Sequence, residues 1–227
     1  MIPIRDNAPG RTFPLVTIGL IAANGAVFVL YQLHNLDRSI LDYGFFPCRV
    51  DDSCPALGSS WVITAFTSMF LHAGWEHLLG NMLFLWIFGN NVEDAMGRAR
   101  YLLFYVLAGL AATAAQTAVT FSAAGTAGER IPSVGASGAI AGVLGAYFVL
   151  LPRARVLVWS FFLVFEVPAI LFLGLWFLFQ LWSGGFSVLQ PEAGGGVAFF
   201  AHVGGFAFGL LTVRLFATRP PARRMLR

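Results

Sequence analysis

The sequence predicts an all-α membrane protein, built as a bundle of six transmembrane helices, and composition is the first observation behind this. Hydrophobic residues make up 58% of the 227 residues and charged residues only 11%, whereas a soluble domain carries about a quarter charged residues. The second observation is a series of six apolar segments. The 25 glycines fit helices that pack closely in lipid. The net charge of +3 gives no sign of nucleic-acid binding, because most arginines lie in short loops or at the termini.

The apolar segments are long enough to cross a bilayer. The first, residues 13–32, forms about 30 Å of helix, which matches a bilayer core. It is too long for a signal peptide, so we expect a retained transmembrane helix. Glu166 and Pro168 interrupt the long apolar stretch that precedes the fifth span, which predicts an interfacial or bent first part. The remaining spans are predicted at residues 76–92, 101–121, 136–151, from about 167 to 182, and 196–216.

The arginines predict the orientation of this bundle. Eleven of the fourteen arginines lie at the N-terminus, in the 2–3 and 4–5 loops or at the C-terminal end. The positive-inside rule therefore places both termini in the cytoplasm. We accordingly expect a cytoplasmic N-terminal segment at residues 1–12, a six-helix domain at 13–217 and a basic cytoplasmic tail at 218–227. Between the first two spans, residues 33–62 mix charged and aromatic side chains, which predicts a partly folded loop at the membrane interface.

The two cysteines, Cys48 and Cys54, both lie in this loop. No CxxC motif or His/Cys cluster accompanies them, so we expect no metal site. If the loop faces an oxidising compartment, a local disulfide can form between them. Two free thiols are the equally weighted alternative.

Four polar residues are expected to converge at one depth in the outer half of the membrane. Ser137 opens a fourth span of about 24 Å, so it should lie several Å below the outer surface. His202 lies six residues after the start of the predicted last span, and His77 and Asn81 share a face of the second span at i,i+4 spacing. Polar groups within spans are costly and usually functional. Singly, the serine could be a helix cap, the histidine could bond a neighbouring carbonyl, and the asparagine could bond another helix.

Small residues support the approach of the fourth and sixth spans. Gly138 and Gly142 form one small-xxx-small motif, and Gly205 and Gly209 form another. Such motifs let helix backbones approach closely in lipid. The pairing would bring the imidazole of His202 within hydrogen-bond reach of the Ser137 hydroxyl. The alternative, that these glycines serve only helix packing, is compatible with this interpretation.

The predicted chemistry is acyl transfer. His202 would take the proton from Ser137, which would attack a peptide carbonyl. The Ser137 backbone N–H, Asn81 and His77 would hold the developing oxyanion. No carboxylate is well placed as a third member, so we predict a Ser–His dyad, with His202 oriented by packing.

These residues resemble the rhomboid family of intramembrane serine proteases. The matching motifs are His77-x-x-x-Asn81, Gly135-Ala136-Ser137-Gly138, and Ala201-His202-x-x-Gly205 with Gly209. The resemblance implies that Ser137 is the nucleophile and His202 the base. It also implies an oxyanion hole formed by His77, Asn81 and the backbone around Ser137, including Gly135. The implied activity needs no cofactor or metal and cleaves transmembrane protein substrates within the bilayer, near their outer ends and beside small residues. We expect a prokaryotic plasma membrane, with the active site opening to the outer face.

The sequence departs from the family pattern at two places. Many members carry a Trp-Arg pair in the first loop, where this chain has Ile63 and Thr64. Many also have an aromatic ring four residues after the nucleophile, stacked on the catalytic histidine, where this chain has Ala141. A neighbouring ring, Phe206 or Phe208, is the candidate to orient His202 instead.

Further polar residues have simpler interpretations. Glu93 with Gly97 is given a structural role at the end of the second span. Gln116 could bring water to the site or, more simply, form a hydrogen bond between helices. We also hypothesise that the fifth span moves to admit substrate laterally, because Pro168 and the glycines of residues 183–195 flank it.

Three other functions compete with proteolysis. An inactive relative could bind and escort membrane proteins, but such relatives lack the serine or the histidine. A transporter or channel usually shows internal repeats, and we find no clear repeat. A structural scaffold does not explain the four converging polar residues.

Overall fold

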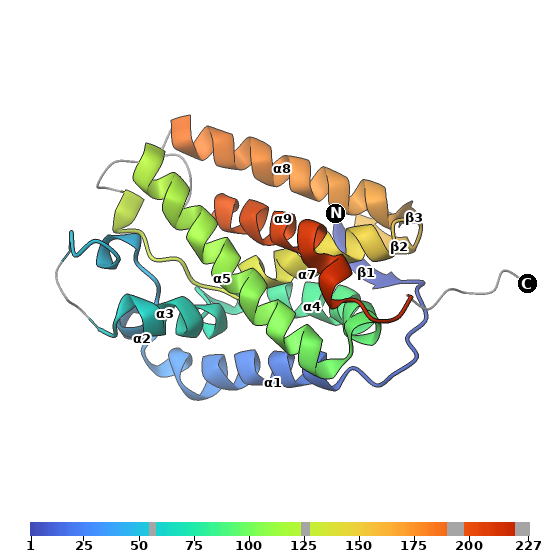
Figure 1. Ribbon diagram of the computed structural model, residues 1–227, viewed down its shortest axis with the longest axis horizontal. Coiled ribbons are helices and arrows are strands. Elements are labelled where there is room, and N and C mark those ends of the chain that lie inside the picture. Colours follow the sequence, from blue (N-terminus) through green and yellow to red (C-terminus); the bar gives the residue numbers. More distant parts are fainter. Residues whose placement is uncertain (55–57, 124–127, 190–197, 221–227) are drawn as a thin grey trace, which may run out of the picture.

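The computed structural model describes residues 1–54, 58–123, 128–189 and 198–220, and it is mostly helical. The described chain has six long helices. They are α1 (Leu15–Leu30), α4 (Trp75–Met96), α5 (Arg98–Ala123), α7 (Ser137–Leu150), α8 (Ala169–Leu189) and α9 (Phe199–Phe216). Of these, α1 and α8 run along the long axis of the molecule in Figure 1, while α5 crosses that view obliquely. Short elements fill the loop after α1, namely η1 (Gln32–His34), α2 (Leu36–Tyr43), η2 (Pro47–Arg49), α3 (Trp61–Thr67) and η3 (Ser68–Phe70).

Four helical segments of the described chain are long and apolar enough to cross a membrane: residues Leu15–His34, Arg98–Ser122, Ala169–Ser187 and Phe199–Phe216. The 22-residue helix α4 is long enough, but it includes acidic residues such as Glu76, Glu93 and Asp94. The helix α7 has only 14 residues, or about 21 Å, which is shorter than a bilayer core. The count of six spans therefore stays a prediction, although each predicted span overlaps one of the six long helices.

The centre of the bundle is α7, where every residue from Gly138 to Tyr147 is buried. Helices α4, α5, α8 and α9 all pack against it. A helix that is apolar on all sides belongs in the interior of a membrane domain, and α7 carries no charged residue along its length. The first residue of this central helix is Ser137, so the core of the fold fixes its position.

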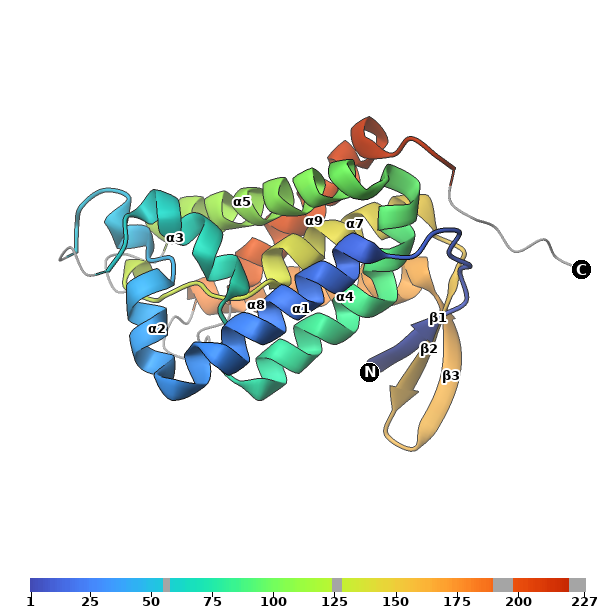
Figure 2. The ribbon, with the colours of Figure 1, turned by 90° about the horizontal axis from the view of Figure 1, so that it is seen from below.

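The prediction of an all-α chain was wrong at one end of the molecule. Strands β1 (Ile2–Asp6), β2 (Arg155–Ser160) and β3 (Leu163–Pro168) form an antiparallel sheet in the order β1-β2-β3, which projects from the bundle in Figure 2. Val158 pairs with Pro3 on one side and with Phe165 on the other. The stretch before α8, predicted as an interfacial or bent first part of the fifth span, is thus a β-hairpin. Its β-branched valines favour strand. In a continuous apolar run, the spacing of hydrophobic residues cannot distinguish a strand from a helix.

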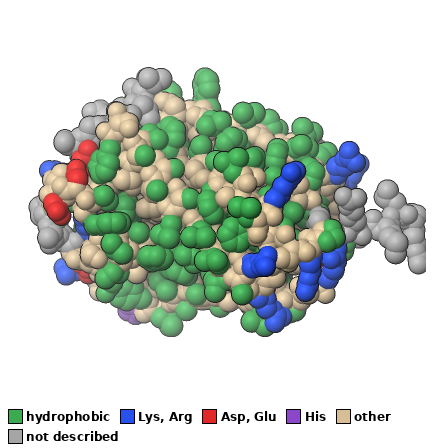
Figure 3. All heavy atoms as spheres, viewed as in Figure 1, with side chains coloured by type: hydrophobic (Ala, Val, Ile, Leu, Met, Phe, Trp, Pro, Cys, Tyr) green, Lys and Arg blue, Asp and Glu red, His purple; other side chains and the backbone are tan. Residues whose placement is uncertain are grey.

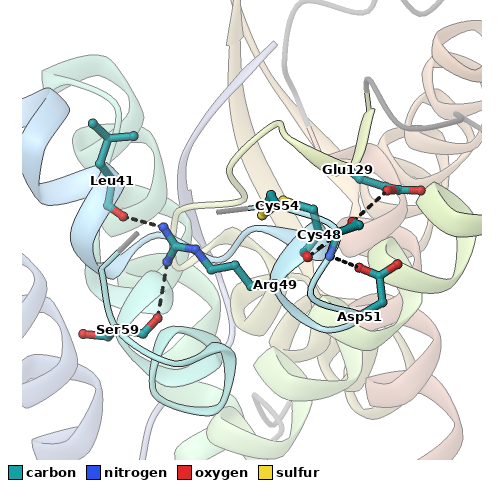
Figure 4. Close-up of a disulfide and its surroundings, with 8 residues drawn as sticks. Leu41, Cys48, Arg49, Asp51, Cys54, Ser59 and Glu129 are labelled. Carbon is teal, nitrogen blue, oxygen red and sulfur yellow. Dashed lines mark hydrogen bonds between the residues drawn. A yellow bond between two sulfur atoms is a disulfide. The ribbon is translucent and has the colours of Figure 1, made fainter. Parts of the chain in front are cut away.

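The loop between α1 and α4 is braced at its centre (Figure 4). Cys48 and Cys54 are joined by a disulfide rather than present as two free thiols. The guanidinium of Arg49 donates to the carbonyl oxygens of Leu41 at 2.7 Å and Ser59 at 3.4 Å, and it lies 4.5 Å from the centre of the Phe46 ring. Arg49 therefore anchors this loop, which has Ile63 and Thr64 at the positions discussed above.

Charged groups hold the other end of the bundle together. The Glu93 carboxylate accepts hydrogen bonds from the backbone N–H groups of Val16 and Thr17 and from the Thr17 hydroxyl. These N–H groups open α1 and have no partner within that helix, which explains why an acidic side chain is buried here. On the face shown in Figure 3, basic side chains gather at this end and hydrophobic side chains cover the middle. Gly97, with φ of +78°, ends α4 directly after this cluster.

We predict that Asp6 makes stability depend on pH. Its carboxylate accepts hydrogen bonds from Tyr147 and from Asn91, but burial disfavours its charged form and raises its pKa to about 6. The contribution of neutral Asp6 is fully present below the unfolded-state pKa of about 3.9 and is lost as pH rises through about 6. Because the group is only half-buried, we expect a loss of about 1 kcal/mol across that window.

The measurement is thermal unfolding of detergent-solubilised protein between pH 4 and pH 7.5, comparing the wild type with Asp6→Asn. The variant should lack this component of the pH dependence, while the control Asp37→Asn, at an exposed position, should keep it. Equal slopes in the wild type and Asp6→Asn would contradict the prediction.

Candidate active site

The structure brings Ser137 and His202 into hydrogen-bond contact. The Oγ atom of Ser137 lies 2.8 Å from Nε2 of His202. Ser137 is the first residue of α7, and His202 is the fourth residue of α9. The predicted start of the last span at residue 196 lies outside the described residues. The backbone N–H groups of the first turn of α7 have no acceptor within the helix, so they are free to face a negative charge near Ser137.

Close approach of two backbones allows this contact. A Cβ atom added at Gly205 would collide with the carbonyl oxygen of Gly138, and one added at Gly209 would collide with that of Gly142. The two glycine motifs therefore face each other across the α7–α9 interface. Because the imidazole of His202 extends from the same interface, the separation of the two helices sets its distance from Ser137.

His77 and Asn81 lie on the α4 side of the serine. The backbone N–H of Ala73 donates to Nδ1 of His77 over 3.3 Å, so a neutral His77 carries its proton on Nε2. The Nδ2 atom of Asn81 is buried and has no hydrogen-bond partner among the described residues. A buried amide donor without a partner costs free energy, and such a donor is ready to receive an oxyanion.

Gly135 contributes space rather than a donor. Its N–H donates to the carbonyl oxygen of Ser68 at 2.9 Å, so the prediction that it belongs to the oxyanion hole is corrected here. Its φ of +120° favours glycine. A Cβ at this position would lie 2.8 Å from Nε2 of His77. The missing side chain therefore makes room for the His77 ring beside the segment that leads into Ser137.

Helix α8 supplies the groups that contact the far side of His202. The Oε1 atom of Gln180 lies 2.8 Å from Nδ1 of His202, and the centres of the Trp176 and His202 rings are 5.9 Å apart. Neither ring suggested by the sequence has this role, because Phe206 stacks on Phe177 and Phe208 packs against Phe104.

Sequence reasoning missed Gln180, although a signal was present. It is the only amide side chain in the apolar stretch from residue 169 to residue 182. A polar side chain at such a position in a membrane span usually has a specific partner, here the imidazole of His202.

A cavity of about 470 Å³ adjoins these polar groups. Ser137, His202, His77 and Asn81 line it together with residues of α4, α7 and α8, among them Gly80, Phe84, Ile140, Ala141, Leu144 and Trp176. The lining is mostly apolar, and Ala141 leaves open the place where many family members carry a ring. The cavity can therefore hold an apolar chain segment beside the hydroxyl of Ser137.

The remaining polar candidates have structural contacts. Gln116 accepts a hydrogen bond from the Ala201 N–H at 3.1 Å and donates to Thr120 at 3.3 Å, which is the simpler of its two interpretations. Within the described chain, no group of three His, Cys, Asp or Glu side chains is arranged to hold a metal ion. Glu93 and Asp94 contact the N-terminal part of the chain around α1, far along α4 from His77.

Comparisons with known proteins agree with these motifs. The model of the Rhomboid domain matches residues 59–219. The chain is 29% identical over 198 residues to the bovine presenilin-associated rhomboid-like protein, mitochondrial, covering 85% of this chain and 46% of the relative. It is 31% identical over 201 residues to the Saccharomyces cerevisiae rhomboid protein 1, mitochondrial, covering 85% and 50%. It is 35% identical over 133 residues to the Bacillus subtilis rhomboid protease GluP, covering 59% and 24%.

The chain thus spans about half the length, or less, of these curated relatives. Several relatives are mitochondrial by name, so the comparisons do not support the prediction of a prokaryotic plasma membrane. Its apolar helices make the chain a membrane protein.

We predict that Gly209→Ala separates α7 from α9. Because the added methyl group would meet the Gly142 carbonyl, the free energy of unfolding should fall by about 1 to 3 kcal/mol. Labelling of Ser137 by a fluorophosphonate should fall as well, since α9 carries His202. The matched control is Gly19→Ala in α1, where no atom lies within 4 Å of an added Cβ. Unchanged melting and labelling of Gly209→Ala would rule out the close contact.

Proposed function

The chain belongs to the rhomboid family, and on that premise we propose that it is an intramembrane serine endopeptidase that cleaves transmembrane segments of membrane proteins. The observation that carries the proposal is the 2.8 Å separation between Ser137 Oγ and His202 Nε2. An inactive escort protein has no need of this contact, nor of the nearby amide donor of Asn81, which has no partner among the described residues.

The proposed reaction begins with proton transfer. Nε2 of His202 accepts the proton of Ser137 as Oγ attacks the carbonyl carbon of the scissile peptide bond. His202 then donates that proton to the leaving amine, and an acyl-enzyme ester on Ser137 remains. Water, deprotonated by His202, attacks the ester and releases the acid product, which returns Ser137 to its hydroxyl form.

The oxyanion of each tetrahedral intermediate is held by donors on two helices. The Ser137 N–H opens α7 and is not engaged within the helix, while Nδ2 of Asn81 and Nε2 of His77 belong to α4. These donors lie beside the mostly apolar cavity, where hydrogen bonds to a developing charge are stronger than in water. Their positions are set before substrate binds, because the backbone contacts around Gly135 and Ala73 hold the segments in place.

We further propose that the six long helices span the membrane, with both termini on the arginine-rich side. Arg11 donates to the carbonyl oxygen of Pro220 at 2.8 Å, so the N-terminal and C-terminal segments lie together. The disulfide of Cys48 and Cys54 lies in the loop beyond the other end of α1, which suits an oxidising compartment. The short helix α7 then leaves Ser137 below the surface on that side, and substrates would be cut near their outer ends.

The deciding experiment uses proteoliposomes that contain the protein and a reporter with one transmembrane helix. We expect Ser137→Ala and His202→Ala each to reduce cleavage to background, a loss of at least about 10³-fold, since either residue alone is essential to the pair. Cleavage by either variant at the wild-type rate would refute the dyad. An escort protein would bind the reporter without cutting it, in the wild type as in the variants.

We predict a separate effect for the oxyanion donor on α4. Asn81→Ala should lower kcat by about 10²-fold with little change in KM, because the amide bonds the charge that develops only during the reaction. The control on the same helix is Leu79→Ala, whose side chain is exposed on the outside of the bundle. A rise in KM at unchanged kcat would instead assign Asn81 to substrate binding.

A further inference from the structure

We propose that Gln180 is a positioning residue that fixes the tautomer and orientation of His202, so that the catalytic pair is completed by helix α8. This inference deepens the proposed function and rests on it. It starts from the single hydrogen bond between Oε1 of Gln180 and Nδ1 of His202, 2.8 Å in length. The Gln180 side chain is buried, with 5% of the residue exposed.

The chemistry of the two partners determines where the proton lies. The amide oxygen of Gln180 can only accept, so Nδ1 of His202 must be the donor. In a neutral imidazole the other nitrogen, Nε2, then carries no proton. Nε2 is therefore free to accept the hydroxyl proton of Ser137, which is the tautomer that a general base requires. The opposite tautomer would place a hydrogen between Nε2 and Oγ and leave Ser137 without a base.

The need for such a group follows from the surroundings of His202. Ala141 offers no ring to stack on the imidazole. The ring of Trp176, tilted by 38° at 5.9 Å, limits the space of the imidazole but gives Nδ1 no acceptor. Since Trp176 and Gln180 are four residues apart in α8, they lie on the same face of that helix. One helical face thus supplies both a wall and an acceptor for the base.

An amide suits this position because it orients the ring without adding a charge. A carboxylate beside Nδ1 would have to be buried in an apolar environment, which costs free energy unless it is paired. The amide oxygen accepts the same hydrogen bond at a smaller cost of burial. Gln180 accordingly orients His202, which is the function that a third residue has in a catalytic triad.

The test compares Gln180→Met with Gln180→Glu in the reconstituted full chain. Methionine keeps the length and volume of the side chain but cannot accept from Nδ1, so kcat should fall by about 10²-fold, as expected for a misaligned catalytic group, with KM nearly unchanged. Glutamate restores the acceptor and should recover at least a tenth of the wild-type kcat. Leu178→Met, at a side chain exposed on the outside of α8, is the control for the methionine substitution and should retain full activity.

A second readout does not depend on cleavage. In protein labelled with ¹⁵N-histidine, the signals of His202 are assigned by their loss in His202→Ala. The wild type should show the tautomer with the proton on Nδ1, and Gln180→Met should show a mixture. A purely structural role of Gln180 would change the melting temperature and leave the tautomer as it is.

The outcomes separate this inference from the proposed function. Wild-type activity that depends on Ser137 but not on Gln180, with an unchanged tautomer in Gln180→Met, would overturn the role of Gln180 alone. A wild type that never cleaves would overturn the proposed function, and the tautomer measurement would still decide whether Gln180 orients the ring. Failure of Gln180→Glu to recover kcat while its tautomer matches the wild type would also contradict the proposal.

Discussion

The contact between the backbones of α7 and α9 is the constraint on which the site depends. Where Gly205 and Gly209 face the carbonyl oxygens of Gly138 and Gly142, no side chain can stand between the helices. In lipid, where apolar side chains gain little by leaving one apolar environment for another, such close packing is a main source of helix association. The same contact brings the imidazole of one helix to the hydroxyl of the other, so packing and chemistry share one interface.

The two ends of the bundle differ in whether their buried polar side chains are hydrogen-bonded. At the arginine-rich end, Glu93 receives three hydrogen bonds from the start of α1, and it serves to close the fold. At the other end, the amide donor of Asn81 is buried without a partner in the described chain. A donor left in this state weakens the folded protein. Its retention beside a serine hydroxyl makes sense if the missing acceptor is a charge that exists only during a reaction.

Much of the site could be predicted from sequence because membrane helices restrict where polar residues lie. Ser137, His202, His77 and Asn81 interrupt apolar segments, and helical spacing then gives their depth and face. The sheet could not be predicted in this way, since an apolar run such as residues 156–159 lacks a distinguishing period. The role of Arg49 was missed and Gly135 was given the wrong role for another reason: their partners, Leu41 and His77, are set by loop geometry and by space rather than by a pattern along the chain.

The absence of a ring at position 141 has two linked consequences. It opens the cavity beside Ser137 where α4, α7 and α8 meet, and it leaves the orientation of His202 to residues outside α7. Those residues, Trp176 and Gln180, both lie on α8, which is the outermost helix at the top of Figure 1 and packs against α9 and α7. If α8 moved outward to admit a substrate helix, Gln180 would leave Nδ1, and the base would lose its acceptor while the cavity was open. Return of α8 would restore the acceptor, so that the catalytic pair would be aligned only when the substrate segment was already enclosed.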